Sequence, residues 1–465
     1  MQHPFHRLIK IKKDNMRKLT WIFTIILLLS FTVNPVNGQW KKLVKKDLSG
    51  WEQLNGTAPF RVEKGVVVGT TVLDSPNSFI CTKEKYGDFI LEFDTWFDPQ
   101  MNSGVQIRSE SRPDYQNGRV HGYQVEMDPS ERAWSGGIYD EARRGWLYTL
   151  DKNPAGQKAL KVGEWNHYRV EAIGTSIRTW VNGIPCADLI DDMTPAGFIG
   201  LQVHSIGKDN SKVGLQVKWK NIKIMTKNLE KYKTPYEPLI PQFSYLDNSL
   251  TSREIKDGWK LLFDGKTSAG WMNAKTRSFP ASGWEIRNGI LSVNPESKKP
   301  GEGGDIVTTE RFKNFELSID FMYTKGANSG IKYFVDIESD NGSLASIGCE
   351  YQVLDDRNHP DAQAGFAGNR TLAGLYDLIA PKNKRDNGDN QWSRAVIVVN
   401  GNKVQHWLNG FLTVEYERST PAWKELVTTS KFKSIKGFGE ASEGRILLQD
   451  HGNSVSFKNI KIREF

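Results

Sequence analysis

The chain has 465 residues and a formal net charge of +8. Residues 1–38 contain six Lys or Arg and one Asp, so the rest of the chain carries a net charge of only +3. A charge that small over so many residues gives no reason to expect nucleic-acid binding or attraction to an acidic membrane surface.

The N-terminal segment has the layout of a secretory signal. Arg17 and Lys18 precede an apolar run over residues 19–33, and Asn-Gly follows at 37–38. This run of about 15 residues is short for a hydrocarbon core of about 30 Å. We therefore expect residues 1–38 to be a cleaved signal peptide. We also expect export to the periplasm or the medium, with no membrane span after cleavage. The alternative is that the apolar run is a transmembrane anchor.

The remaining sequence contains one set of motifs twice. The first copy has Trp51, Asn-Ser-Gly at 102–104, Gly-Ile-Tyr-Asp at 137–140, Trp-Val-Asn-Gly at 180–183 and Gln-Val-His at 202–204. The second has Trp271, Asn-Ser-Gly at 328–330, Gly-Leu-Tyr-Asp at 374–377, Trp-Leu-Asn-Gly at 407–410 and Gln-Asp-His at 449–451. The offset grows along the chain, which indicates one duplicated domain whose second copy gained insertions. We expect domains over 39–228 and 256–465, joined by a proline-containing linker over 229–255.

Short apolar or alternating segments separated by Gly, Asn, Asp and Pro predict an all-β fold. In the first copy they cover residues 61–68, 89–97, 105–108, 123–127, 168–173 and 177–181. Asn-Gly at 182–183 and 409–410 predicts two β-hairpins, because a type I′ turn needs positive φ at both central residues. We therefore expect two antiparallel sheets packed face to face in each copy. Residues 233–242, with three prolines, predict an extended, semi-rigid linker.

One predicted strand in each copy presents a carboxylate and a carboxamide on the same face. In the second copy these are Glu350 and Gln352; in the first copy the order is reversed, with Gln124 and Glu126. Residues i and i+2 of a strand lie roughly 6.5 to 7 Å apart, so both side chains could touch one sugar-sized ligand. A solvated sheet face is the ordinary alternative explanation.

Further polar and aromatic residues follow this strand in both copies. They are Asp356, Arg370, Tyr376, Gln449 and His451 in the second copy, and Tyr139, Arg143, Trp146, Gln202 and His204 in the first. Their repetition indicates either a shared site or a shared fold constraint.

Tryptophan and cysteine give weaker indications. Trp134, Trp146 and Trp392 are candidate sugar-stacking platforms, whereas Trp180 and Trp407 are expected to fill the core. The three cysteines match no zinc spacing. Cys81 and Cys186 could form a disulfide in the first copy, and buried free thiols are the alternative.

The motifs of the second copy closely resemble the 3-keto-disaccharide hydrolase domain family. They are Gly-Cys-Glu-Tyr-Gln-Val-Leu-Asp-Asp at 348–356, His-Pro-Asp-Ala at 359–362, Leu-Tyr-Asp-Leu-Ile at 375–379 and Leu-Gln-Asp-His-Gly at 448–452. Gly-Tyr-Gln-Val-Glu-Met-Asp-Pro at 122–129 makes the first copy similar to a more divergent member. The resemblance implies two tandem concanavalin A-like jelly-roll β-sandwiches and export by a bacterium that degrades glycans.

The resemblance also implies attack on glycosides whose C3 hydroxyl is oxidised to a ketone. A base removes the C2 proton, an enolate forms, and the C1 substituent leaves by β-elimination. His451 or Glu350 is the expected base, with Gln352, Gln449, Tyr376 and Arg370 as oxygen-binding partners and Asp356 as an orienting group. The corresponding residues in the first copy are His204, Glu126, Gln124, Tyr139 and Arg143, with Trp146 as a further contact.

The exchanged order of Gln124 and Glu126 predicts that only one copy is active if the chemistry needs an acid at one fixed position. No cofactor is expected to be required, although a divalent cation is compatible with the acidic residues. An ordinary glucanase-like glycosidase and a noncatalytic sugar-binding module are the alternative functions. The expected partner is a carbohydrate, and oligomeric state is left open.

Overall fold

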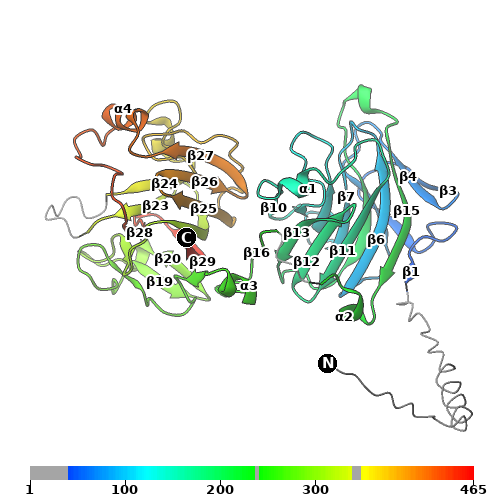
Figure 1. Ribbon diagram of the computed structural model, residues 1–465, viewed down its shortest axis with the longest axis horizontal. Helices are drawn as coiled ribbons and strands as arrows, with labels where there is room; N and C mark the ends of the chain where they lie inside the picture. The colour runs from blue at the N-terminus through cyan, green and yellow to red at the C-terminus, as the bar shows by residue number, and fades with distance from the viewer. Residues whose placement is uncertain (1–39, 236–239, 338–346) are drawn as a thin grey trace, which may run out of the picture. The chain divides into compact units, whose positions relative to one another are not determined.

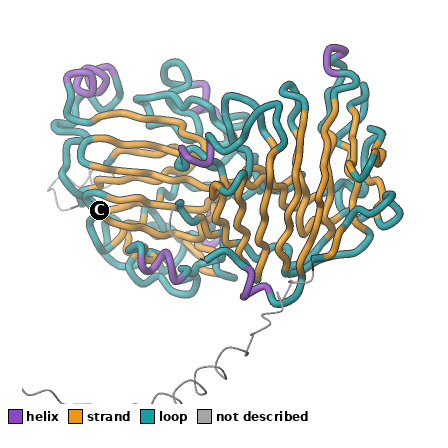
Figure 2. The backbone as a smooth tube through the Cα atoms, turned by 45° about the vertical axis from the view of Figure 1, so that its right-hand side comes forward, coloured by secondary structure: helices purple, strands orange, loops and turns teal. Residues whose placement is uncertain are grey.

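The computed structural model describes residues 40–235, 240–337 and 347–465. The predicted signal peptide lies outside these residues. Figure 2 shows that strands form nearly all of the regular structure, with only short helices at the edges. Within the described ranges, no helix is long and apolar enough to cross a membrane.

The first copy forms two sheets (Figure 1). One sheet has the order β16-β13-β12-β11-β6-β15-β4-β3, with β1 beside β15, and the other has the order β10-β9-β8-β7-β14-β5-β2. The bounds of the first sheet are β16 (Phe243–Ser244), β13 (Ile184–Ile190), β12 (Ser176–Val181), β11 (Asn166–Ile173), β6 (Phe89–Phe97), β15 (Gln216–Met225), β4 (Val66–Thr70), β3 (Phe60–Glu63) and β1 (Lys41–Lys42). Those of the second are β10 (Gly145–Tyr148), β9 (Ile138–Glu141), β8 (His121–Met127), β7 (Ser103–Glu110), β14 (Phe198–Val203), β5 (Ser78–Thr82) and β2 (Trp51–Leu54).

The second copy repeats this plan with a sheet in the order β19-β20-β29-β22-β25-β26-β27, with β17 beside β29, and a sheet in the order β18-β21-β28-β23-β24. The bounds of the first are β19 (Trp284–Arg287), β20 (Ile290–Val293), β29 (Val455–Glu464), β22 (Phe315–Tyr323), β25 (Ser393–Asn400), β26 (Lys403–Leu408), β27 (Phe411–Glu417) and β17 (Lys260–Leu261). Those of the second are β18 (Trp271–Asn273), β21 (Ile306–Thr308), β28 (Arg445–Leu448), β23 (Asn328–Val335) and β24 (Cys349–Leu354). The prediction of two all-β sandwiches is therefore confirmed.

Alternation along the strands builds each core. Tyr123 and Val125 of β8 are fully buried in the first core, and Tyr351 and Val353 of β24 are fully buried in the second. The polar residues between them necessarily face the other side of the sheet. The fold therefore presents the predicted carboxylate and carboxamide rows opposite the apolar core.

The predicted hairpins are also present. Asn182 and Gly183 have φ values of 50° and 80° between β12 and β13, and Asn409 and Gly410 have values of 50° and 84° between β26 and β27. Positive φ at both positions is what Asn-Gly supplies with least strain.

The described residues of the predicted extended segment, 233–235 and 240–242, contain no helix or strand. The wider connection between the copies includes α2 (Leu229–Tyr232), the strand β16 and the start of α3 (Ser252–Lys256). β16 adds to the first sheet by pairing in parallel with β13. Thr251 and Glu254 form a capping box at the start of α3, which accounts for a helix in so short a segment. Residues 236–239, which include one of the linker prolines, lie outside the described part.

Three tryptophan predictions were wrong. Trp180 and Trp407 are partly exposed, because the inward positions of their strands are occupied by residues such as Val181 and Leu408. Trp134, predicted as a sugar platform, is only 3% exposed and belongs to the first core. Trp392 is half-buried, with the Lys458 ammonium 4.7 Å from its ring centroid. All three cysteines are free and buried, so Cys81 and Cys186 are not bridged.

The two copies differ most in one connection. β13 and β14 of the first copy are joined by residues 191–197, whereas β27 and β28 of the second are joined by residues 418–444. The longer connection contains α4 (Pro421–Thr429), whose N-cap is Thr420. This insertion adds material to the second sandwich that has no counterpart in the first.

Candidate active site

Two adjacent strands carry the polar row of the second sandwich. In the β23–β24 pair, Gly330 is opposite Gln352 and Lys332 is opposite Glu350. A Cβ atom at Gly330 would overlap the Glu350 carboxylate, so glycine is needed for that side chain to lie across the sheet. The Nζ atom of Lys332 lies 3.9 Å from Oε2 of Glu350. The row therefore pairs a cation with a carboxylate.

This row forms one side of a cavity of about 200 Å³. The polar residues that line it are Asn328, Lys332, Glu350, Gln352, Tyr376, Lys431, Gln449 and His451. Five of them, Glu350, Gln352, Tyr376, Gln449 and His451, are residues singled out in the sequence. The structure therefore brings together, around one cavity, side chains from β24, from the loop after it and from the segment after β28.

Glu350 has an unusual electrostatic environment. Its side chain is 8% exposed, and this burial raises the pKa of its carboxyl group above the ordinary value. The positive charges of Lys332 and Lys431 oppose the rise by favouring the ionised form. A buried carboxylate with a raised pKa is a stronger base than an exposed one, so Glu350 suits proton abstraction.

Lys431 reaches the cavity from the insertion between β27 and β28. Its Nζ atom lies 3.9 Å from the ring centroid of Tyr376, and its backbone N–H donates to Oδ2 of Asp377 at 2.7 Å. Lys431 is exposed as a residue, but partial desolvation of its ammonium group lowers its pKa, and the charges of Glu350 and Asp377 oppose this effect. The hydrogen bond from the Lys431 backbone to Asp377 thus positions the Lys431 ammonium group at the cavity that holds the Glu350 carboxylate.

Arg370 and Asp356 do not line this cavity. This position corrects the oxygen-binding role predicted for Arg370, whereas Asp356 was predicted only to orient the site. Arg370 donates from Nε to Asp377 at 2.6 Å and from Nη1 to Asp361 at 3.1 Å. The hydroxyl of Tyr376 donates to the same Asp361 at 2.8 Å. Arg370 therefore holds the loop that carries Tyr376.

Asp356 has a similar structural role. Its Oδ1 atom accepts the backbone N–H of Leu372 at 2.8 Å, and its other oxygen pairs with Lys384. These bonds fix the beginning of the same loop, so Asp356 orients the site through the backbone and does not face the cavity.

In the first sandwich, neutral amides replace the charged pair. Gln106 of β7 is opposite Gln124 of β8, in the places of Lys332 and Glu350. Gln106 donates to Gln124 at 2.7 Å, and Gln124 donates to Glu126 at 3.0 Å. Three buried side chains thus satisfy one another in a chain of hydrogen bonds.

Glu126 is the only ionisable group of this chain of hydrogen bonds. Burial raises its pKa to about 7, although hydrogen bonds from Asn102 and Gln124 oppose the rise. Asn102 donates to Oε1 of Glu126 at 2.6 Å. Both carboxylate oxygens are therefore already occupied by amide donors.

Of the other predicted residues of the first copy, Tyr139 of β9 is opposite Gln124, and burial raises the pKa of the Tyr139 hydroxyl with a contribution from the charge of Glu126. Arg143 pairs with Asp140 at 2.7 Å and lies over the ring of Tyr123, on the core side of β8, so its predicted contact with a ligand on the other face was wrong. His204 is exposed and lines a cavity of about 280 Å³ whose other lining residues include Asp128.

Trp146 and Tyr139 of the first copy pack against each other, with ring centroids 5.3 Å apart. Trp146 also makes an edge-to-face contact with the buried Trp134 at 4.7 Å. The predicted aromatic platform is therefore partly used in internal packing.

The family model of the 3-keto-alpha-glucoside-1,2-lyase-like domain matches residues 39–225 and again residues 258–463. The chain belongs to this family. A 3-keto-disaccharide hydrolase of Bacteroides thetaiotaomicron is 38% identical over 230 residues, which cover 44% of this chain and 78% of the relative.

Two solved structures from Parabacteroides distasonis, both described as candidate glycosyl hydrolases, are also similar. One is 28% identical and covers 47% of this chain and 99% of its own, with a TM-score of 0.43. The other is 23% identical and covers 44% and 99%, with a TM-score of 0.33.

Sequence reasoning missed two cations of the second family domain. Lys332 shares a strand face with Asn328 and Gly330 of the repeated motif, so two-residue periodicity from that motif would have found it. Lys431 lies in the insertion, and comparison of the two copies gives no signal for it. Across the described ranges, no group of three or more His, Cys, Asp and Glu side chains is arranged to hold a metal ion.

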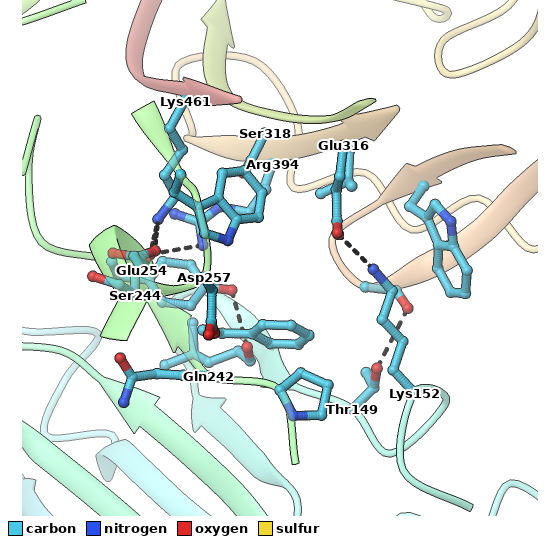
Figure 3. Close-up of a pocket in the computed structure, with 18 of the residues that line it drawn as sticks. Thr149, Lys152, Gln242, Ser244, Glu254, Asp257, Glu316, Ser318, Arg394 and Lys461 are labelled. Carbon is cyan, nitrogen blue, oxygen red and sulfur yellow. Dashed lines mark hydrogen bonds and ion pairs between the residues drawn. The ribbon is translucent and has the colours of Figure 1, made fainter. Parts of the chain in front are cut away.

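A cavity of about 330 Å³ elsewhere is lined by residues of both family domains and of the linker. Figure 3 shows its charged side chains directed at one another: Lys461 pairs with Glu254, and Lys152 pairs with Glu316 at 2.7 Å. Of the predicted site residues, Trp146 alone lines this cavity. The charged side chains of this larger cavity pair with one another, so the cavity around Glu350 is the better candidate for catalysis.

Proposed function

We propose that the second sandwich cleaves 3-keto-glycosides or 3-keto-disaccharides by removing the C2 proton and expelling the C1 substituent. The observation that carries the proposal is the buried Glu350 carboxylate beside Lys332 and Lys431 in a cavity that suits one sugar ring. Membership of the 3-keto-alpha-glucoside-1,2-lyase-like family supports the choice of an oxidised sugar as substrate.

The first half of the reaction is proton abstraction. The C3 ketone acidifies the C2–H bond, Glu350 accepts the proton, and the electron pair moves onto the C3 oxygen as an enolate. The ammonium groups of Lys332 and Lys431 stabilise this negative charge, as preorganised donors do at other oxyanions. Gln352, whose buried Oε1 atom has no hydrogen-bond partner among the described residues, and Gln449 orient the sugar hydroxyls.

The second half is elimination. The ketone re-forms, a C1–C2 double bond forms, the C1–O bond breaks, and the departing oxygen takes a proton from His451. His451 is exposed and lines the cavity, which suits exchange of that proton with solvent. Addition of water across the double bond, with a proton returned to C2 by Glu350, makes the net reaction a hydrolysis.

An ordinary glycosidase needs two carboxyl groups on either side of the scissile bond. Among the described residues that line this cavity, Glu350 is the only carboxylate. The cavity is therefore better suited to enolate chemistry. For the first sandwich, the replacement of the Lys332–Glu350 pair by Gln106 and Gln124 favours a noncatalytic carbohydrate-binding role.

The experiment is a comparison of two substrates. The purified protein is incubated with 4-nitrophenyl glucoside and with its 3-keto derivative, and nitrophenol release is followed by absorbance. We expect release from the 3-keto derivative only. Release from the unoxidised glucoside would favour a conventional glycosidase, and release from neither would favour a binding module.

Two further expectations accompany this proposal. The chain's own side chains supply the base, the acid and the cations, so we expect activity to persist after dialysis against EDTA.

We also propose export after cleavage near Gly38, because the layout of residues 1–38 is that of a signal peptide. Mass spectrometry of the protein produced in a bacterial host should give a mature N-terminus near Gln39.

A further inference from the structure

A second, larger cavity of about 620 Å³ adjoins the candidate active site. Its walls come from two stretches of the second sandwich, residues 273–281 and 298–305, together with Asp450. We call this cavity the groove.

The segment Gln449 to His451 forms a wall that the two cavities share. Gln449 and His451 line the cavity around Glu350, whereas Asp450 lines the groove. Asp450 is fixed there, because its carboxylate accepts from Lys298 Nζ and from the N–H of Gly304, both at 2.7 Å. The backbone N–H of Asp450 in turn donates to Asp305 at 3.0 Å.

Asp305 gives independent evidence that the two cavities adjoin. It lines the groove, and its negative charge is one of the influences that raise the pKa of Glu350. Because charges in proteins are largely screened beyond about 10 Å, this influence indicates that Asp305 lies within about that range of Glu350. The groove therefore begins close to the proposed base.

The volumes of the two cavities suggest a division of the substrate. Cavities for drug-sized ligands have volumes of about 300 to 1,000 Å³. The 200 Å³ around Glu350 is below that range and suits one sugar ring, whereas the 620 Å³ of the groove leaves room for a second ring.

The walls of the groove come from connections that are longer in the second copy. β18 and β19 are joined by residues 274–283, where β2 and β3 are joined by residues 55–59. β20 and β21 are joined by residues 294–305, where β4 and β5 are joined by residues 71–77. The copy that carries the charged Lys332–Glu350 pair is thus the copy with the extended walls.

We infer that the groove binds the leaving group of the proposed reaction, and that this leaving group is a second sugar or a similar polyhydroxylated alcohol. The inference rests on the proposed function and adds the position and class of the aglycone. The lining combines polar and apolar surface in similar amounts, and it includes Gly303 and Gly304 at φ values of 78° and 85°. Phe279 and Pro280 contribute apolar surface for a ring face. Lys298 pairs with Asp450, and the other charged lining residues are Lys275, Glu302 and Asp305. The two positive and three negative charges leave a net charge of only −1, which suits a neutral ligand.

The test fills the groove and compares two substrates. Ala281 is an exposed residue of the groove, so Ala281→Trp should obstruct it without disturbing the core. For a 3-keto disaccharide we expect kcat/KM to fall by about tenfold or more, mainly through a higher KM. For the methyl 3-keto-glucoside, whose leaving group is methanol, we expect a change of less than about twofold.

Two further variants keep the test decisive. Ala155→Trp makes the same substitution at an exposed position of α1 (Pro154–Gln157) in the first sandwich, and both substrates should be unaffected. Thr276→Trp, also in the groove, replaces Ala281→Trp if that variant does not fold. Equal effects on the two substrates, or no effect on either, would overturn the inference alone. Failure of the unaltered protein to cleave either substrate would overturn the proposed function and the inference together.

Discussion

The two sandwiches share the same pair of strands, but the first carries hydrogen-bonded amides at the positions where the second carries a lysine and a glutamate. In the first, Gln106, Gln124 and Glu126 are joined by hydrogen bonds. In the second, Lys332 and Glu350 occupy the corresponding places of the register, and both line an open cavity. The difference is therefore one of charge and of access, on a shared strand pair.

The walls of the two sites differ because of the insertion. The 418–444 connection brings Lys431 and Phe432 over the second site, whereas the 191–197 connection of the first sandwich is too short to do so. Gly104 and Gly330 are retained at the same place, and a Cβ atom would overlap Gln124 at the first and Glu350 at the second. The fold thus requires a glycine and a long polar residue at these positions, and leaves the charge of that residue free to change.

The largest effect should come from neutralising the proposed base. Glu350→Gln keeps the shape of the side chain but cannot accept the C2 proton. We expect kcat/KM for the 3-keto glucoside to fall by about 10² to 10⁴-fold. Nitrophenol release under steady-state conditions measures it.

The matched control is Glu126→Gln in the first sandwich, for which we expect less than about a twofold change. The comparison would be reversed if Glu126→Gln abolished cleavage while Glu350→Gln retained it, and the active site would then belong to the first copy.

The cation supplied by the insertion should have the next largest effect. Lys431→Met removes the ammonium group but keeps an apolar chain against Tyr376. We expect kcat to fall by about 10- to 100-fold, because one of two groups that stabilise the enolate is lost. Lys433→Met, an exposed neighbour on the same connection, should be unchanged. Equal losses in both variants would indicate damage to the loop and no specific role for Lys431.

A smaller effect should appear in the pH dependence. The proposed base must be ionised, so kcat/KM should fall as pH decreases through the raised pKa of Glu350. The positive charge of Lys431 opposes that rise. Lys431→Met should therefore raise the pKa further and move the acidic limb of the profile to higher pH, whereas Lys433→Met should leave the limb in place. A limb that does not move in Lys431→Met would exclude Glu350 as the titrating group.

The features that repeat in the sequence were also the most predictable. The alternation of Tyr351 and Val353 with Glu350 and Gln352, and the Gln449 and His451 pair, were sufficient to predict the strand face and four lining residues. The repeated Gly-Leu-Tyr-Asp motif gave the fifth, Tyr376. Arg370 was misassigned because its sequence neighbourhood does not show that Asp361 and Asp377 already bind it. Lys431 could not be predicted at all, because an insertion without a counterpart offers no periodicity and no repeat from which to infer its position.

The smallest expected effect is on the free energy of unfolding, and it concerns Glu126 of the first sandwich. Burial raises the pKa of Glu126 from 4.5 to about 7, so the folded protein favours the protonated form. The associated stabilisation is fully present below pH 4.5 and is lost as pH increases through about 7. Glu126→Gln has no such titration. The free energy of unfolding of the unaltered protein, measured with urea at pH 5 and pH 8, should therefore decline relative to that of the variant by about 1 to 3 kcal/mol. A constant difference between the two proteins over this range would mean that Glu126 is ionised throughout. The first sandwich would then hold a buried charge as the second does, and the contrast between the sites would reduce to the presence or absence of the lysines.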